Sequence, residues 1–190
     1  MRRYEITIPN LLTSVRIVVV PFVVLEILKE RMNIAFYIFL FGGITDLLDG
    51  FIARRFNMVT KTGAFLDPAA DKIFMVPTIV ALSLKGLIPS WAGIIFVGKD
   101  VFISLSIGIL YLIRRNVPIN PTFAGKSAMF LEGAYLVLVM IDAFINGLGP
   151  IKFLKFCFLY ISLFSAILAV LSYIPAGISI IRGLEFGKKI

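Results

Sequence analysis

Long apolar stretches, separated by short polar segments, follow one another along almost the entire chain. Their positions predict six helices, at about residues 9–28, 33–54, 67–85, 90–113, 127–145 and 151–182. Most of them are close to or above the roughly 20 apolar residues with which a helix crosses a bilayer. We therefore expect an all-α integral membrane protein with six transmembrane helices, preceded by a short N-terminal interfacial segment.

The distribution of positive charge predicts the orientation of these helices. Six spans place both termini on one side, and eleven of the 19 Lys and Arg residues fall there, against five on the opposite side and three within helices. The positive-inside rule then places both termini in the cytoplasm. We expect a multi-pass protein of the cell inner (cytoplasmic) membrane, folded as a single domain over residues 1–190, because no linker divides the chain.

The overall composition narrows the possible partners. The chain is 59% hydrophobic and carries a net charge of +8, which in so apolar a protein suggests contact with anionic lipid rather than with nucleic acid. It contains no His, so any metal ligand or general base has to come from another residue type.

Four aspartates stand out against the apolar background. Asp46 and Asp49 are three residues apart, and Asp67 and Asp71 are four apart, so each pair shares one face of a helix. Two such helices joined by a short loop can bring four carboxylates together, where they would repel one another. A bound divalent cation, or a pair, removes this repulsion, and carboxylate oxygens suit Mg²⁺ or Mn²⁺. The alternative is a set of salt bridges at a helix end.

Small and basic residues surround these acids. Gly50, Ala53 and Gly63 leave room beside the helix backbone, and Arg54 and Lys61 add positive charge. Metal ions, basic side chains and open space are what a phosphate or diphosphate ester requires. Under the orientation above, this group forms a cytoplasm-facing active site.

The stretch as a whole reads D-x2-D-G-x2-A-R-x8-G-x3-D-x3-D, with every fixed position present between Asp46 and Asp71. It resembles the signature of the CDP-alcohol phosphatidyltransferases, integral-membrane enzymes of phospholipid synthesis. The resemblance implies an enzyme that moves the phosphatidyl group of CDP-diacylglycerol to the hydroxyl of an alcohol and releases CMP. It also implies two metal ions and a homodimer.

The same resemblance assigns roles to individual residues. It implies that the four aspartates bind the metal ions, that Asp71 is the general base, and that the nucleotide and its phosphates lie near the small and polar motif positions. The residues alone agree that a carboxylate must be the base, but they leave open which of the four it is. We expect the CDP-lipid to be bound by Asn10, Thr13, Gly50, Ala53, Arg54, Thr60 and Gly63.

The acceptor alcohol is suggested by other segments. IPNLLTSVRIVVVPF and GAFLDPAADK resemble bacterial phosphatidylglycerophosphate synthases, whose acceptor is glycerol 3-phosphate. A basic pocket for that phosphate is expected from Arg114, Arg115, Lys126 and Arg182, although these charges also fit the ordinary positive-inside pattern.

Other segments favour a different acceptor. The chain has Lys99–Asp100 where phosphatidylglycerophosphate synthases usually have Arg-Glu, and Ser127 where they tend to have Thr shortly after a Gly-Lys pair. ALSLKGLIP and GKD resemble cardiolipin synthases, which use phosphatidylglycerol. Glycerol 3-phosphate is the acceptor we expect, with phosphatidylglycerol as the alternative, and an ion or proton transporter is a third possibility.

Two further charged positions lie inside predicted spans and need partners, because an intramembrane charge is costly. Arg16 lies a turn or so into the first helix, and the carboxylates of the acidic motif are its expected partners. Lys99 and Asp100 either neutralise each other or face the centre of the helix bundle, and we favour the second arrangement.

Overall fold

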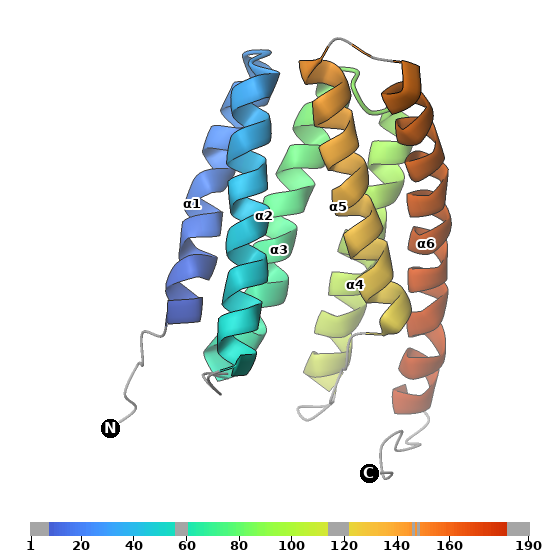
Figure 1. Ribbon diagram of the computed structural model, residues 1–190. Coiled ribbons are helices and arrows are strands. Elements are labelled where there is room, and N and C mark those ends of the chain that lie inside the picture. Colours follow the sequence, from blue (N-terminus) through green and yellow to red (C-terminus); the bar gives the residue numbers. More distant parts are fainter. Residues whose placement is uncertain (1–7, 56–60, 114–121, 146, 148, 182–190) are drawn as a thin grey trace. The chain divides into compact units, whose positions relative to one another are not determined.

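The chain forms six helices and no strand over the residues that the computed structural model describes, namely 8–55, 61–113, 122–145, 147 and 149–181 (Figure 1). Their bounds are α1 Ile8–Leu28, α2 Met32–Arg55, α3 Lys61–Leu84, α4 Ser90–Ile113, α5 Phe123–Phe144 and α6 Gly149–Ile181. The all-α prediction is confirmed. The predicted N-terminal interfacial segment lies outside the described residues.

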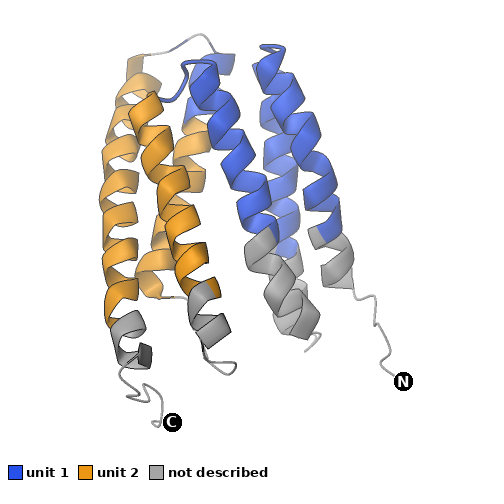
Figure 2. Cartoon of the chain, turned by 180° about the vertical axis from the view of Figure 1, so that it is seen from behind, with its two compact units in different colours: residues 1–88, 139–147 blue, residues 89–138, 148–190 orange. Residues whose placement is uncertain are grey.

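The chain divides into two compact units (Figure 2). Unit 1 comprises residues 1–88 and 139–147, and unit 2 comprises residues 89–138 and 148–190. The expectation of a single domain over residues 1–190 stays a prediction.

In unit 1, α1 packs against both α2 and α3. Its buried face carries Val23 and Ile27, which are fully buried together with Ala35 of α2 and Ile79 of α3. The rings of Phe39 on α2 and Phe74 on α3 stack with their centroids 4.9 Å apart. In a bilayer, close van der Waals packing of this kind holds apolar helices against one another, because lipid is as apolar as the buried side chains.

Two helix ends in unit 1 have the same closing hydrogen bonds. Glu30 (φ 62°) and Gly86 (φ 71°) adopt the left-handed conformation, and the N–H groups around them return to carbonyls of the last turn of α1 and α3. Lys85 Nζ donates to Glu30 Oε1 at 2.8 Å and links the two turns. This hydrogen bond lowers the pKa of Glu30.

In unit 2, α4 contacts α6, and α5 is tied to both. The Ser162 hydroxyl on α6 donates to the carbonyl of Leu131 on α5 at 3.0 Å. Phe96 on α4 and Tyr135 on α5, both buried, hold their ring centroids 5.9 Å apart. Unit 2 is thus built from its own interhelical contacts.

Three stretches of the described residues are long and apolar enough to cross a membrane: Ser90–Gly108, Phe123–Phe144 and Gly149–Pro175. Met32–Asp46 is a shorter apolar helical stretch. Large apolar side chains such as Ile94, Phe130 and Phe164 are exposed along these helices, as expected of surfaces that face lipid. These features suggest a membrane-embedded protein, whereas six spans and their orientation remain predictions.

The predicted starts of two helices were wrong. α3 begins at Lys61 instead of about Asp67. α5 begins at Phe123 instead of Ser127. In both cases polar residues interrupt the apolar pattern. Polarity indicates where a residue meets water or charge, and a helix can continue through such a segment.

Candidate active site

A buried arginine joins the two halves of the acidic motif. Arg16 on α1 is 1% exposed, and its Nη1 donates to Oδ1 of Asp71 on α3 at 2.5 Å. Its Nη2 forms an ion pair with Oδ1 of Asp46 on α2. The prediction that the motif acids are the partners of Arg16 is confirmed for these two carboxylates.

The position of Arg16 follows from the buried face of α1. Val20 and Val23 lie four and seven residues further along the helix and are 6% and 0% exposed, so the same face that packs the core carries the guanidinium. The carboxylates around it are more open, with side-chain exposures of 39% for Asp46 and 21% for Asp71. A ligand can therefore reach the acids while the guanidinium stays covered.

The two described carboxylates of the acidic motif are of the chemical type that binds a hard divalent cation. Asp46 and Asp71 bring carboxylate oxygens from two helices to one guanidinium, and oxygen donors are what Mg²⁺ and Mn²⁺ prefer. Asp49 lies in α2 and Asp67 in α3, one helical turn from these acids, but their side chains are outside the described residues. Among the side chains that are described, no group of three or more His, Cys, Asp or Glu could hold a metal ion.

The expected CDP-lipid residues are only partly located. Asn10 and Thr13 belong to α1, Gly50, Ala53 and Arg54 to α2, and Gly63 to α3, but none of their side chains is among the described ones. Thr60 lies wholly outside the described residues. Their roles stay predictions.

Of the four expected acceptor residues, Lys126 alone has a described position. It lies in the first turn of α5, its side chain is exposed, and its N–H donates to the carbonyl of Thr122 at 3.1 Å. Arg114, Arg115 and Arg182 lie outside the described residues. The expected basic pocket is therefore untested.

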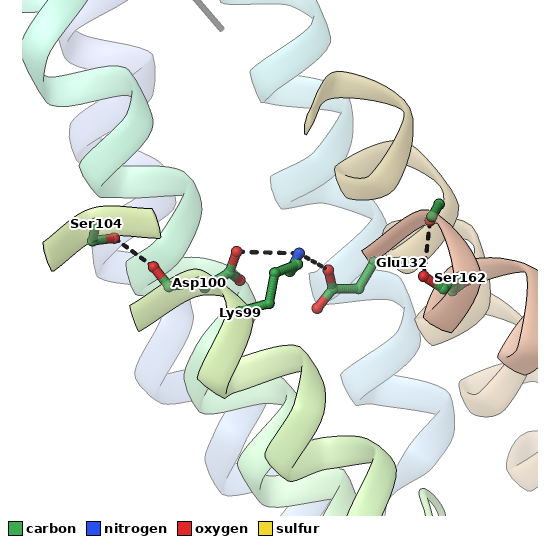
Figure 3. A network of polar contacts seen from close by, with 6 residues as sticks. Lys99, Asp100, Ser104, Glu132 and Ser162 are labelled. Carbon is green, nitrogen blue, oxygen red and sulfur yellow. Dashed lines mark hydrogen bonds and ion pairs between the residues drawn. The ribbon is translucent and has the colours of Figure 1, made fainter. Parts of the chain in front are cut away.

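Unit 2 contains a buried ionic cluster that the sequence revealed only in part (Figure 3). Lys99 Nζ lies 2.5 Å from Oε2 of Glu132 on α5 and 3.1 Å from Oδ1 of Asp100. Lys99 is 7% exposed and Glu132 is 2% exposed. Lys99 thus pairs with its neighbour Asp100 and is buried against Glu132 of the same unit. The favoured arrangement, in which Lys99 and Asp100 face the centre of the whole bundle, stays a prediction. The sequence did not predict that Glu132 is the partner of Lys99. What could have indicated it is that Glu132 is a charged residue inside an otherwise apolar predicted helix.

Comparison with known proteins identifies the class to which this fold and site belong. The model of the CDP-alcohol phosphatidyltransferase family matches residues 6–172. The chain belongs to this family, which generally uses divalent metal ions.

Individual relatives of known name are similar to large parts of the chain. Cardiolipin synthase (CMP-forming) of Streptomyces coelicolor is 32% identical over 146 residues, which are 72% of this chain and 66% of that protein. The probable cardiolipin synthase (CMP-forming) of Drosophila melanogaster is 40% identical over 125 residues, 65% of this chain and 38% of that protein. Human cardiolipin synthase (CMP-forming) is 40% identical over 119 residues, 62% of this chain and 39% of that protein. The matched regions thus span less than two thirds of these relatives.

Proposed function

We propose that this protein transfers the phosphatidyl group of CDP-diacylglycerol to a hydroxyl of phosphatidylglycerol, forming cardiolipin and releasing CMP. The observation that carries the proposal is the similarity of 119–146 residues to proteins named cardiolipin synthase from a bacterium, an insect and a mammal. Family membership supports the general reaction, and the relatives support the choice of acceptor.

This choice reverses the acceptor expected from the sequence. The N-terminal stretch and GAFLDPAADK favoured glycerol 3-phosphate, whereas the relatives favour phosphatidylglycerol. Lys99–Asp100, which departs from the Arg-Glu pair usual in phosphatidylglycerophosphate synthases, fits the new assignment. The transporter alternative has no support from a family of transferases.

In the proposed reaction, residues of the acidic motif act on the donor lipid and on the acceptor hydroxyl. Asp71 takes the proton of the acceptor hydroxyl, whose oxygen attacks the phosphorus that bears the diacylglycerol. A new P–O ester bond forms as the P–O bond to CMP breaks. Arg16 holds Asp71 and Asp46 in place through its two terminal nitrogens.

Asp46, Asp49, Asp67 and Asp71 would hold the metal ions. Bound Mg²⁺ or Mn²⁺, as a pair, would stabilise the negative charge that develops on the departing CMP. Arg54 and Thr60 would contact the nucleotide phosphates, and Gly50 and Ala53 would leave space for them.

Phosphatidylglycerol is anionic through its phosphodiester, so the acceptor side still requires positive charge. We assign the acceptor phosphate to the basic side chains expected from the sequence, namely Arg114, Arg115, Lys126 and Arg182. A cytoplasm-facing site in the inner membrane and a homodimer complete the proposal.

An acceptor screen tests it. Purified protein in phospholipid micelles with CDP-diacylglycerol and Mg²⁺ receives either phosphatidylglycerol or glycerol 3-phosphate, and products are identified by mass. We expect cardiolipin and CMP from phosphatidylglycerol, little product from glycerol 3-phosphate, and no product after addition of EDTA. If glycerol 3-phosphate gives product and phosphatidylglycerol does not, cardiolipin synthesis is rejected. The protein would still be a CDP-alcohol phosphatidyltransferase.

A further inference from the structure

A directed chain of hydrogen bonds ties the beginning of α5 to α6 within unit 2. The Ser172 hydroxyl on α6 donates to the carbonyl of Ala169 at 2.7 Å, so its oxygen is the acceptor in the 2.8 Å contact with the Thr122 hydroxyl. The Gly125 N–H in turn donates to Thr122 Oγ1 at 3.1 Å. Each hydroxyl in the chain is thereby both donor and acceptor.

Thr122 is the N-cap of α5. It precedes Phe123, and its hydroxyl satisfies the N–H of the third helical residue, Gly125. An N-cap usually serves its own helix alone. Here the same hydroxyl also reaches α6, so the first turn of α5 is fixed to a second helix.

Close packing reinforces this attachment at Gly125. A Cβ placed there would lie 3.2 Å from the Tyr173 hydroxyl oxygen of α6 and 3.2 Å from Thr122 Oγ1. Nine in ten real Cβ contacts are wider than 3.4 Å. A side chain at position 125 would therefore require Tyr173 of α6 or Thr122 to shift by a few tenths of an ångström, which glycine avoids.

Lys126 follows Gly125 directly. Its N–H donates to the Thr122 carbonyl, and its side chain is exposed. A lysine side chain is a flexible point charge, so the place of its ammonium depends strongly on where its backbone is held. In this chain the N–H of Lys126 is held by the carbonyl of Thr122, and the Thr122 side chain is in turn tied to Ser172 of α6.

We propose that Thr122 and Ser172 are positioning residues that place Lys126 for binding the phosphate group of the acceptor. The inference rests on the proposed function for the role of Lys126 at the acceptor and for naming that group as the phosphodiester of phosphatidylglycerol. Glycerol 3-phosphate presents the same chemistry to Lys126. The inference can therefore be tested with whichever acceptor the screen identifies, and its failure is distinguishable from failure of the proposed function.

The test compares two substitutions at one position. Thr122→Val removes the hydroxyl and both of its contacts at nearly constant shape, whereas Thr122→Ser keeps the hydroxyl. We expect Thr122→Val to raise the KM for the acceptor about tenfold, the order expected for a weakened charge-assisted hydrogen bond. The kcat and the KM for CDP-diacylglycerol should change less than about twofold, and Thr122→Ser should behave as the wild type.

A double-mutant cycle with Lys126→Ala separates positioning from general stability. If Thr122 acts through Lys126, Thr122→Val has almost no further effect on the acceptor KM once Lys126 is alanine. A purely structural role predicts the same added loss in both backgrounds. Additive effects, or an unchanged acceptor KM in Thr122→Val, would overturn the proposal.

A second pair of variants covers the case in which Thr122→Val does not fold. Gly125→Ala pushes its Cβ against the Tyr173 hydroxyl and should raise the acceptor KM. Adding Tyr173→Phe removes that oxygen and should restore most of the loss. A Gly125→Ala enzyme with wild-type acceptor KM would contradict the positioning role.

Discussion

Arg16 contacts Oδ1 of Asp71 on α3 while its other terminal nitrogen pairs with Asp46 on α2, so one buried guanidinium joins the two halves of the acidic motif. A planar guanidinium can bind two carboxylates at once because its N–H groups form a rigid fork. Unit 1 thus has a defined arrangement of two motif acids before any ligand is considered.

Substitution of Arg16 should destabilise the apo protein. Arg16→Met removes the positive charge between two carboxylates, and we expect a loss of about 2 kcal/mol in the free energy of unfolding. This is below the roughly 3–5 kcal/mol typical of fully buried pairs, because Asp46 and Asp71 are partly exposed. Arg16→Lys should lose less, since it keeps the charge. Thermal unfolding in detergent measures both.

Magnesium provides the control for that prediction. If the acids hold a cation, Mg²⁺ should raise the Tm of Arg16→Met more than that of the wild type, because the ion supplies the missing positive charge. Equal shifts in the two proteins would argue against metal binding beside Arg16.

Two adjacent glycines in α2 should respond oppositely to alanine. A Cβ at Gly42 would lie 2.7 Å from the ring of Phe74, which stacks on Phe39, whereas a Cβ at Gly43 meets nothing within 4 Å. We expect Gly42→Ala to cost about 1–3 kcal/mol through overpacking. Gly43→Ala should stabilise by about 0.5–1 kcal/mol, because alanine is the better helix former. Chemical denaturation of the two variants checks the sign, and equal effects would refute the packing around Gly42.

Substituting one residue of the buried pair Lys99–Glu132 should lower the free energy of unfolding more than substituting both by apolar residues. Glu132→Leu leaves the Lys99 ammonium without its 2.5 Å partner in a buried site, and we expect a loss of about 3 kcal/mol. Lys99→Met combined with Glu132→Leu should recover part of this loss, because no uncompensated lysine charge remains, but Asp100 loses the Lys99 ammonium. Chemical unfolding of the single and double variants measures the coupling energy between Lys99 and Glu132. A double variant no more stable than Glu132→Leu would contradict this prediction.

The sequence predicted local features of the fold better than its long-range pairings. Apolar stretches located all six helices, with α4 at Ser90–Ile113 as expected, because periodicity and length are local properties. The starts of α3 and α5 were missed where polar residues continue a helix. The pairing of Lys99 with Glu132 could not be predicted, because 33 residues separate them and no local pattern says which helices pack together.

The same division applies to the candidate site. Arg16 was expected to find the motif acids, since a charge inside a span needs a partner and few were available. The preference for glycerol 3-phosphate rested on short segments, some of which resemble phosphatidylglycerophosphate synthases and others cardiolipin synthases. Acceptor choice depends on how several separate segments are brought together, which single segments do not determine.

The proposed role of Asp71 as the general base can be tested by the substitution Asp71→Asn. Asp71→Asn keeps the size of the side chain and an oxygen that can accept from Arg16, but it removes basicity and one ligand charge. We expect turnover to fall by roughly a hundredfold or more, while CDP-diacylglycerol still binds, measured without acceptor so that no reaction occurs. Glu26→Gln is the matched control, because it changes a carboxylate of α1 that pairs with Lys29 and Arg31 outside the motif. If Asp71→Asn turns over normally while the control does too, the proton must leave through another group. Asp46, Asp49 and Asp67 would then be the carboxylates to substitute next, since the chain has no His to take that role.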